Sequence, residues 1–560
     1  MSRKNAKSTR RSFLQTTLGT AATLTTLPAF AAARDVPATK SSQAVDNCSH
    51  RIVEPFELDE VTVADLQDGM KSGKFTAASL VQKYLSRISE IDSLENDKPQ
   101  PHLNSILELN PDAPAIAATL DEERKAKGPR GPLHGIPVLI KDNIATADRM
   151  QTTAGSLALV GAKCPKDSFV AQKLRAAGAV ILGKTNLSEW ANIRSSHSTS
   201  GWSGRGGLTR NPYALDRNTS GSSSGTGAGI SANLAAVGIG TETDGSIISP
   251  SSCCGLAGIK PTVGLISRAG IIPISHSQDT AGPMCRTVLD AAILLSALAG
   301  VDPEDSATAA SAGKTQTDYS QFCDPNGLKG ARIGVARKYF GFSDLVDALV
   351  EQALDVMKKQ GATLVDPADI ETFGKFDDTE MTVFMYELKA DLTRYLAGLN
   401  STQIHTLKDI IDFNERNRAK EMPWFGQDLF VRSHGKGSLT DKEYLDALTN
   451  NQQLTRTKGI DALMAKHNLD AIVAPTGGPA WLTDLVNGDH APGGSSNAAA
   501  VAGYPNINVT AGNIAGLPVG ISFWGRAWSE PTLIKIAYSF EQATKARQRP
   551  TFLASVGLSG

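Results

Sequence analysis

The string at 178–185 is the most recognisable group of residues that could do chemistry. It reads Gly-Ala-Val-Ile-Leu-Gly-Lys-Thr, which satisfies the phosphate-binding loop pattern letter for letter. That loop requires a strand before its first glycine and flexible residues between its glycines. Here the residues between the glycines are apolar and strand-forming, and helix-like sequence precedes Gly178. We therefore expect a strand over 179–182, with Lys184 just beyond it, rather than a nucleotide site.

A second string, Gly-Ser-Ser-Ser-Gly at 221–225, fits the nucleophile elbow of the α/β-hydrolases, with Ser223 as the attacking residue. That elbow follows directly on a hydrophobic strand, whereas residues 216–220 are polar. It also needs a later aspartate and histidine. The later histidines lie in no telling context: His276, His405, His434, His467 and His490. The elbow is therefore disfavoured.

The third candidate combines three separate segments. Lys141 follows the apolar run Val-Leu-Ile at 138–140, Ser222 lies in the Gly/Ser string, and Ser246 ends the sequence Thr-Glu-Thr-Asp-Gly-Ser. A serine hydroxyl is a weak nucleophile until a base removes its proton. Lysine can be that base only if its amine is neutral, and burial favours the neutral form by desolvating the cation. The apolar run before Lys141 is consistent with such a buried site.

These three segments resemble those of the amidase signature family. Residues 134–143 are similar to its lysine segment, 221–225 to its Gly/Ser loop and 240–246 to its nucleophile loop. Ser222 and Ser246 are 24 residues apart, which is the family's spacing. Each match alone is weak, whereas the combination is highly specific.

The resemblance extends over most of the chain. It resumes at 503–505 and at 516–520 and is weaker over about 300–470. Within the family, the nucleophile loop and residues 264–268 look most like the bacterial peptide amidases, which remove the C-terminal amide from peptides.

The resemblance implies a Ser-Ser-Lys triad. As a neutral amine, Lys141 would take a proton from Ser222, which would take the proton of Ser246 as that oxygen attacks the amide carbonyl. The proton would return to the leaving nitrogen, and water would hydrolyse the acyl-enzyme. No metal and no other cofactor is expected. In the family the peptide bond before the relay serine is cis, so we expect a cis bond between Gly221 and Ser222.

The resemblance also implies an oxyanion hole built from backbone N–H groups of the nucleophile loop: Thr243, Asp244, Gly245 and Ser246. The chain departs from the family at Asp244, where most members have glycine. Its carboxylate is expected either to contact a substrate amine or peptide N–H, or to cap the loop. Ile248 stands where many members have arginine, which weakens the interpretation as a tRNA-dependent amidotransferase subunit.

Five further residues have predicted roles around this site. Ser223, Thr199 and Ser200 are candidates for substrate contact, with loop support as the alternative for Ser223. We expect His134 to be a hydrogen-bonded turn residue, and Asp279 to hold a neighbouring loop in place.

The wider pattern predicts one large α/β domain, with a central mixed sheet flanked by helices. The expected strands are 137–141, 179–182, 331–335, 363–365, 471–475 and 507–509. The expected helices begin after Thr62 and Thr76 and cover 168–177, 230–237, 345–354 and 533–543. Residues 195–229, rich in Ser and Gly, are expected to be loop, and a loop is also expected after 237–240.

The N-terminus predicts export. An Arg10-Arg11 pair precedes a stretch rich in Thr and Ala that ends near Ala31. Residues 1–33 therefore resemble a twin-arginine signal. The stretch is shorter than the ~20 apolar residues of a membrane span, so we expect cleavage and a periplasmic or secreted enzyme rather than a membrane anchor. A linker or arm over 34–56 would follow, and then an amidase domain over 57–555.

Inside that domain we expect a signature core at about 131–290 and a helical insertion at about 300–470. The formal net charge of −1 supplies no field that would attract nucleic acid or an anionic membrane. The six cysteines show no metal-binding spacing, and most are expected to be small buried hydrophobes. The sequence does not determine the oligomeric state, for which a monomer is the default expectation.

The predicted function is hydrolysis of carboxamide bonds with release of ammonia, on C-terminal amides of peptides or on small amides. The alternatives are an amidase of unrelated small aryl or aliphatic amides, an amidotransferase A-type subunit, and a binding protein that keeps the fold without the chemistry. An intact Lys-Ser-Ser set argues against the binding protein, and the export signal argues against the amidotransferase.

Overall fold

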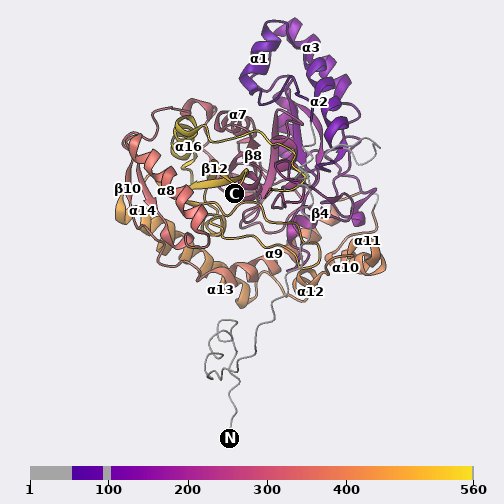
Figure 1. The fold of residues 1–560 in the computed structure, drawn as a ribbon. Helices are drawn as coiled ribbons and strands as arrows, with labels where there is room; N and C mark the ends of the chain where they lie inside the picture. Colours follow the sequence, from indigo (N-terminus) through magenta and orange to yellow (C-terminus); the bar gives the residue numbers. More distant parts are fainter. Residues whose placement is uncertain (1–52, 93–101, 401, 558–560) are drawn as a thin grey trace, which may run out of the picture. The chain divides into compact units, whose positions relative to one another are not determined.

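A single mixed sheet organises the part of the chain that the computed structural model describes, which is residues 53–92, 102–400 and 402–557. The sheet has 11 strands in the order β1-β3-β2-β6-β8-β7-β12-β13-β11-β9-β10. Neighbouring strands run parallel in β3-β2-β6 and in β11-β9-β10, and antiparallel elsewhere. Helices flank this sheet (Figure 1), so the predicted α/β class is confirmed.

The strands are mostly short and buried. Those of the main sheet are β1 (Ile106–Leu109), β2 (Pro137–Lys141), β3 (Val180–Thr185), β6 (Val237–Glu242), β7 (Ala257–Lys260), β8 (Thr280–Cys285), β9 (Arg332–Val335), β10 (Thr363–Val365), β11 (Ala471–Pro475), β12 (Asn506–Ile514) and β13 (Leu517–Trp524). A separate two-stranded sheet pairs β4 (Trp202–Ser203) with β5 (Gly207–Leu208).

The α-helices fall into groups that pack on the sheet and on one another. They are α1 (Val63–Lys71), α2 (Ala77–Ile91), α3 (Ala113–Lys127), α4 (Phe169–Ala176), α5 (Ser224–Ser231), α6 (Ile248–Cys253), α7 (Val288–Leu298), α8 (Asp344–Lys359), α9 (Asp377–Ala397), α10 (Leu407–Arg416), α11 (Arg418–Glu421), α12 (Asp428–His434), α13 (Lys442–Gln452), α14 (Asp461–His467), α15 (Asn497–Ala502) and α16 (Glu530–Thr544). A π-helical segment, Gln453–Ile460, joins α13 to α14.

The predicted helix starts are confirmed by their caps. The side chains of Thr62 and Thr76 accept hydrogen bonds from the N–H groups of Asp65 and Ser79, and each forms a complete capping box. All six expected strands are present, with small shifts at their ends. The expected helices at 168–177, 345–354 and 533–543 correspond to α4, α8 and α16.

The predicted loop at 195–229 is correct up to Ser223, apart from the short strands β4 and β5, and the loop predicted after 237–240 is present but begins only after Glu242. The end of the first loop and the predicted helix at 230–237 are wrong. Helix α5 begins inside the Gly/Ser-rich stretch, and residues 237–242 are strand β6. Packing overrides the weak helix propensity of glycine here, since every residue of α5 is buried. A Cβ atom added at Gly238 of β6 would come 2.6 Å from Ile230 of α5, so the small residues let helix and strand approach closely.

The predicted insertion at about 300–470 contains both the expected strands 331–335 and 363–365 and a helical region. Strands β9 and β10 extend the edge of the main sheet, and a helical region begins only at α9 and ends with α14. Helix α9 packs against α12 and α13 (Figure 1). No helix in the described ranges is long and apolar enough to cross a membrane. The predicted signal (1–33) and most of the predicted arm (34–56) lie outside the described residues.

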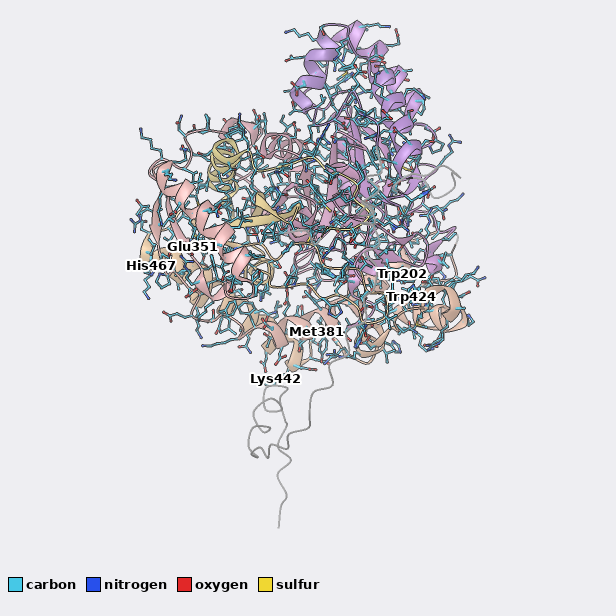
Figure 2. All side chains as sticks on the ribbon, viewed as in Figure 1. Trp202, Glu351, Met381, Trp424, Lys442 and His467 are labelled. Carbon is cyan, nitrogen blue, oxygen red and sulfur yellow. The ribbon has the colours of Figure 1, made fainter. Side chains whose placement is uncertain are left out.

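Aromatic contacts join the helical region to the Ser-rich segment near position 200. The ring of Trp202 packs edge-on against Phe425, with 5.3 Å between ring centroids. Trp202 and Trp424, the residue before Phe425, are labelled in Figure 2. The guanidinium of Arg194 lies over both rings. Of the cysteines in the described ranges, Cys253, Cys254 and Cys285 are buried free thiols, as expected; Cys164 and Cys323, also free, are half-buried.

Candidate active site

Lys141 and Ser222 meet in the interior of the fold. Lys141 ends strand β2 and is 0% exposed, and its Nζ donates to Ser222 Oγ at 2.7 Å. The same Nζ donates to the carbonyl oxygen of Thr241 at 3.1 Å and to Thr241 Oγ1 at 2.9 Å. Because β2 and β6 are parallel neighbours, their carboxyl ends bring Lys141 and Thr241 to the same edge of the sheet.

Burial lowers the pKa of Lys141 to about 7. Desolvation of the cation is the largest cause, and the carboxylates of Glu242 and Asp279 act in the opposite direction from a distance. No carboxylate forms an ion pair with Lys141 in the described part of the chain. A substantial fraction of this side chain is therefore a neutral amine near pH 7.

The Gly/Ser loop carries Ser222 at a tightly packed corner. The Gly221–Ser222 peptide bond is cis, as the family resemblance implied. A Cβ atom at Gly221 would come 2.2 Å from Ser188 Oγ and 3.0 Å from Ser200 Oγ, so only glycine fits at this position. Ser223 Oγ donates to the carbonyl oxygen of Thr241 and accepts from its N–H. Ser223 thus links the Gly/Ser loop to strand β6. This contact matches the alternative in which Ser223 supports the loop.

The nucleophile loop continues directly from β6 and places Ser246 beside the Gly/Ser loop. The carbonyl oxygen of Ser246 accepts a hydrogen bond from the N–H of Ser223 at 3.2 Å. Gly245 has a φ of +74°, which favours glycine, and a Cβ there would come 3.0 Å from Ser249 Oγ. Glu242 Oε2 accepts from the N–H groups of Ile247 and Ile248 and so closes the loop.

The four backbone N–H groups predicted to form an oxyanion hole are free of protein acceptors. Those of Thr243, Asp244, Gly245 and Ser246 donate to no other residue within the described ranges. Successive free N–H groups beside a serine are the arrangement that stabilises a developing oxyanion in acyl transfer.

The predicted support by Asp279 is confirmed. Asp279 Oδ1 accepts from Thr243 Oγ1 at 2.6 Å, and its Oδ2 accepts from the N–H groups of Ile274 and Ser275. Gln278 donates from its side-chain amide to the carbonyl oxygen of Thr243 at 3.2 Å. The side chain and the carbonyl of Thr243 are thus both held from one neighbouring turn.

The remaining predicted contact residues bond other parts of the protein. Asp244 Oδ1 accepts from Ser496 Oγ at 2.6 Å, and burial raises the pKa of Asp244 to about 6, with Glu242 adding to the rise. Thr199 Oγ1 donates to the carbonyl oxygen of Asp484. Ser200 Oγ accepts from Asn192 Nδ2 and lies next to Gly221. Ser200 therefore contacts the Gly/Ser loop that carries Ser222.

The competing motifs have structural roles. The four residues between the glycines of the phosphate-loop pattern are buried, three of them in β3, and Lys184 Nζ donates to the carbonyl oxygen of Ile144 and to Thr152 Oγ1. Residues 209–220, all of them described, form no strand ahead of the Gly/Ser loop, where the elbow would require one. His134 is a buried turn residue that bonds the carbonyl oxygen of Leu120, as expected.

Sequence reasoning missed three residues that shape the site: Thr241, Glu242 and Gln278. Thr241 supplies two of the three partners of Lys141 Nζ, and Glu242 closes the nucleophile loop. Both lie within the recognised loop string, but a string carries no signal for the strand pairing that directs Thr241 towards Lys141. Gln278 lies next to Asp279, and only the folded turn shows that both hold Thr243.

Comparison with curated proteins places this geometry in a family. The family model described as Amidase matches residues 79–534. A probable amidase of Arabidopsis thaliana is 41% identical over 90% of this chain and 94% of its own. A putative amidase of Schizosaccharomyces pombe is 37% identical over 88% of this chain and 87% of its own. A glutamyl-tRNA(Gln) amidotransferase chain of Acinetobacter baumannii is 33% identical over 87% of this chain and 97% of its own.

Solved structures give the same result. The peptide amidase of Stenotrophomonas maltophilia superposes with a TM-score of 0.83 and is 49% identical, over 89% of this chain and 99% of its own. A peptide amidase in complex with the competitive inhibitor chymostatin superposes with a TM-score of 0.84 and 49% identity, over 88% of this chain and 100% of its own. With its buried Lys141–Ser222 pair and free N–H groups before Ser246, and with these matches over most of its length, the chain belongs to the amidase family.

Proposed function

We propose that this protein hydrolyses carboxamides through an acyl-enzyme, with Ser246 as nucleophile, Ser222 as proton relay and Lys141 as base. The hydrogen-bond set of Lys141 Nζ carries the proposal. A neutral amine has two N–H bonds and one lone pair. The two oxygens of Thr241 can take both N–H bonds, which leaves the lone pair facing Ser222 Oγ across 2.7 Å.

In the first step the Lys141 lone pair accepts the Ser222 proton while Ser222 Oγ accepts the Ser246 proton. Ser246 Oγ then bonds to the carbonyl carbon, and the carbonyl oxygen becomes an oxyanion that the free N–H groups of the nucleophile loop stabilise. The proton passes back along the same path to the amide nitrogen, and the C–N bond breaks to release ammonia from a primary amide. Water attacks the acyl-enzyme by the same relay and frees Ser246.

For the substrate we propose C-terminal amides of peptides. Support comes from the peptide amidases among the similar solved structures, at 49% identity over nearly their whole length. Unrelated small aryl or aliphatic amides remain the alternative. The amidotransferase relatives are less similar, at 33% identity.

Purified protein tests both parts of the proposal. We expect it to release ammonia from a peptide amide without added metal or nucleotide, and to prefer this substrate over aryl and short aliphatic amides. Ser246→Ala should abolish release. Ammonia release that persists in Ser246→Ala would contradict the nucleophile, and a preference for small amides would contradict the substrate class.

We also propose that the twin-arginine-type segment exports the enzyme to the periplasm or medium. Its support is the sequence pattern around Arg10 and Arg11. Replacing both residues by lysine should move the activity of fractionated cells into the cytoplasm. An unchanged distribution would contradict this route.

A further inference from the structure

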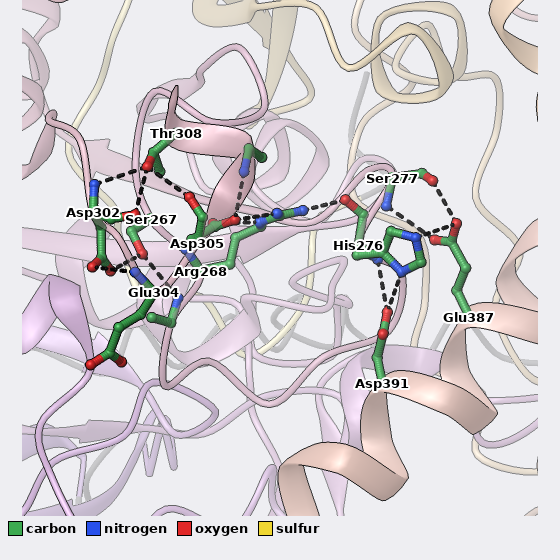
Figure 3. A network of polar contacts seen from close by, with 12 residues as sticks. Ser267, Arg268, His276, Ser277, Asp302, Glu304, Asp305, Thr308, Glu387 and Asp391 are labelled. Atoms are coloured by element: carbon green, nitrogen blue, oxygen red, sulfur yellow. Dashed lines mark hydrogen bonds and ion pairs between the residues drawn. The ribbon is translucent and has the colours of Figure 1, made fainter. Parts of the chain in front are cut away.

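The turn Ile274–Asp279, here called the support turn, connects helix α9 to the nucleophile loop. Its inner end holds Thr243 through Asp279 and Gln278. Its outer end lies against α9, where His276 and Ser277 face Glu387 and Asp391 (Figure 3). The helical region therefore contacts the reaction site through this short segment.

The outer contacts form a dense polar clamp. Glu387 is 0% exposed and accepts from Ser275 Oγ, from Ser277 N–H and Oγ, and from the hydroxyl of Tyr444. Asp391 Oδ2 accepts from the backbone N–H of His276 at 3.2 Å and lies 2.6 Å from its Nδ1.

His276 lies between the two carboxylates. Its Nδ1 faces Asp391 and its Nε2 is 3.2 Å from Glu387 Oε1 (Figure 3). Histidine, aspartate and glutamate side chains in such a group could hold a metal. Here, however, protein donors reach both oxygens of Glu387, and Arg394 pairs with the second oxygen of Asp391. An imidazolium that donates from both nitrogens matches these surroundings without an added ion.

We propose that His276 is a positioning residue for the hydrolysis: as an imidazolium between Glu387 and Asp391, it fixes the support turn and thereby holds Thr243 in the oxyanion loop. This inference rests on the proposed function. It assigns a role in the chemistry to helix α9, whose residues Glu387 and Asp391 act on the nucleophile loop only through the support turn.

The charge on His276 makes this positioning depend on pH. Partial desolvation of the half-exposed His276 side chain lowers its pKa, but the two carboxylates together outweigh this effect and raise the pKa above its usual value. The other groups that face it are the hydroxyl of Tyr444, at 3.4 Å from Nε2, and the guanidinium of Arg268, which donates to the His276 carbonyl oxygen. The imidazolium is present below its raised pKa and is lost as pH rises through it. We expect kcat to fall on the alkaline side for this reason.

Two substitutions test the inference in the full-length enzyme. His276→Asn keeps a donor near Asp391 but carries no charge. We expect it to lower kcat by about 10- to 100-fold near neutral pH with little change in KM, because a small displacement of catalytic groups has effects of this size. We also expect its kcat to lose the alkaline decline. His276→Lys keeps a cation that titrates near ~10.4, so it should retain most of kcat and move the decline to higher pH.

The measurement is ammonia release from a peptide amide between about pH 5 and about pH 10, with thermal unfolding recorded for each variant. His434→Asn, an exposed histidine at the end of α12, is the matched control and should behave as the native enzyme. A native kcat without alkaline decline, a folded His276→Asn with native kcat and pH profile, or a His276→Lys with the native decline would each overturn the inference. If one variant does not fold, the other decides. If the native enzyme releases no ammonia, the proposed function fails instead.

Discussion

Two buried lysines lie near the ends of neighbouring strands, and we propose a catalytic role for one and a structural role for the other. Lys141 ends β2 and Lys184 lies one residue before the end of β3, and the two strands pair in parallel. Both side chains are 0% exposed, and burial lowers the pKa of both. Lys184 bonds a carbonyl oxygen and a threonine, and Asp142 favours its charged form. Lys141 also bonds a carbonyl oxygen and a threonine, but it has a serine hydroxyl as a third partner, and that hydroxyl lies beside a free nucleophile loop. In the proposed mechanism, a buried lysine becomes a base through its partners, not through burial alone.

The largest expected difference comes from replacing each lysine. Lys141→Met should lower kcat by about 10⁴-fold or more, because members of a catalytic relay act as a unit. Lys141→Arg should be similarly inactive, since guanidinium does not deprotonate in this range. Lys184→Met should stay active but lose about 1–3 kcal/mol of stability, because it leaves buried acceptors unpaired. Steady-state rates and urea unfolding separate the two outcomes, and an active Lys141→Arg would refute the lysine base.

The pH dependence should show the same contrast. The amine of Lys141 works as a base only when neutral, and its pKa is about 7. Below that value kcat/KM should fall about tenfold per pH unit, and above it the acid limb should end, before the separate alkaline decline expected from His276. Lys184→Met should keep this acid limb unchanged. An acid limb with a midpoint near ~4, typical of a carboxylate base, would point to a different base.

Each of the two lysines bonds a threonine, and replacing these threonines should give a similar contrast with a smaller loss of kcat. Thr241→Val removes one acceptor of Lys141 Nζ, so the lone pair is no longer directed at Ser222; we expect kcat to fall by about tenfold. Thr152→Val makes the matched change beside Lys184 and should affect only stability. Equal losses of kcat in both variants would mean that the Thr241 contacts do not orient the amine.

The smallest effect is expected at Asp244. Asp244→Asn keeps an acceptor for Ser496 Oγ and removes the carboxyl beside the nucleophile. If the carboxyl only caps the loop, kcat and KM should change by less than about threefold, an amount expected from weakening one hydrogen bond. A KM that rises about tenfold for peptide amides but not for small amides would instead assign it to substrate binding.

The sequence indicates the segments of the candidate site and the α/β class of the fold, but it misses several contacts that join them. Lys141, Ser222 and the nucleophile loop lie in three short strings that are weak signals one by one and specific in combination. Helix α5 was missed because its glycines are poor helix formers in isolation, and only packing against β6 stabilises them. Thr241 and Gln278 were missed because their roles come from strand pairing and from a folded turn. Glu387 and Asp391 carry no local signal, since they meet the support turn from more than 100 positions away.

Direct titration of the Lys141 amine tests the central claim most directly. Selective carbon-13 labelling of lysine side chains, with Lys141→Met to assign the signal and Lys184→Met as the neighbouring reference, would follow the amine by NMR. We predict a midpoint near 7 for Lys141. A midpoint near ~10.4, the ordinary value for lysine, would leave no neutral amine at working pH and would contradict the lysine-base mechanism.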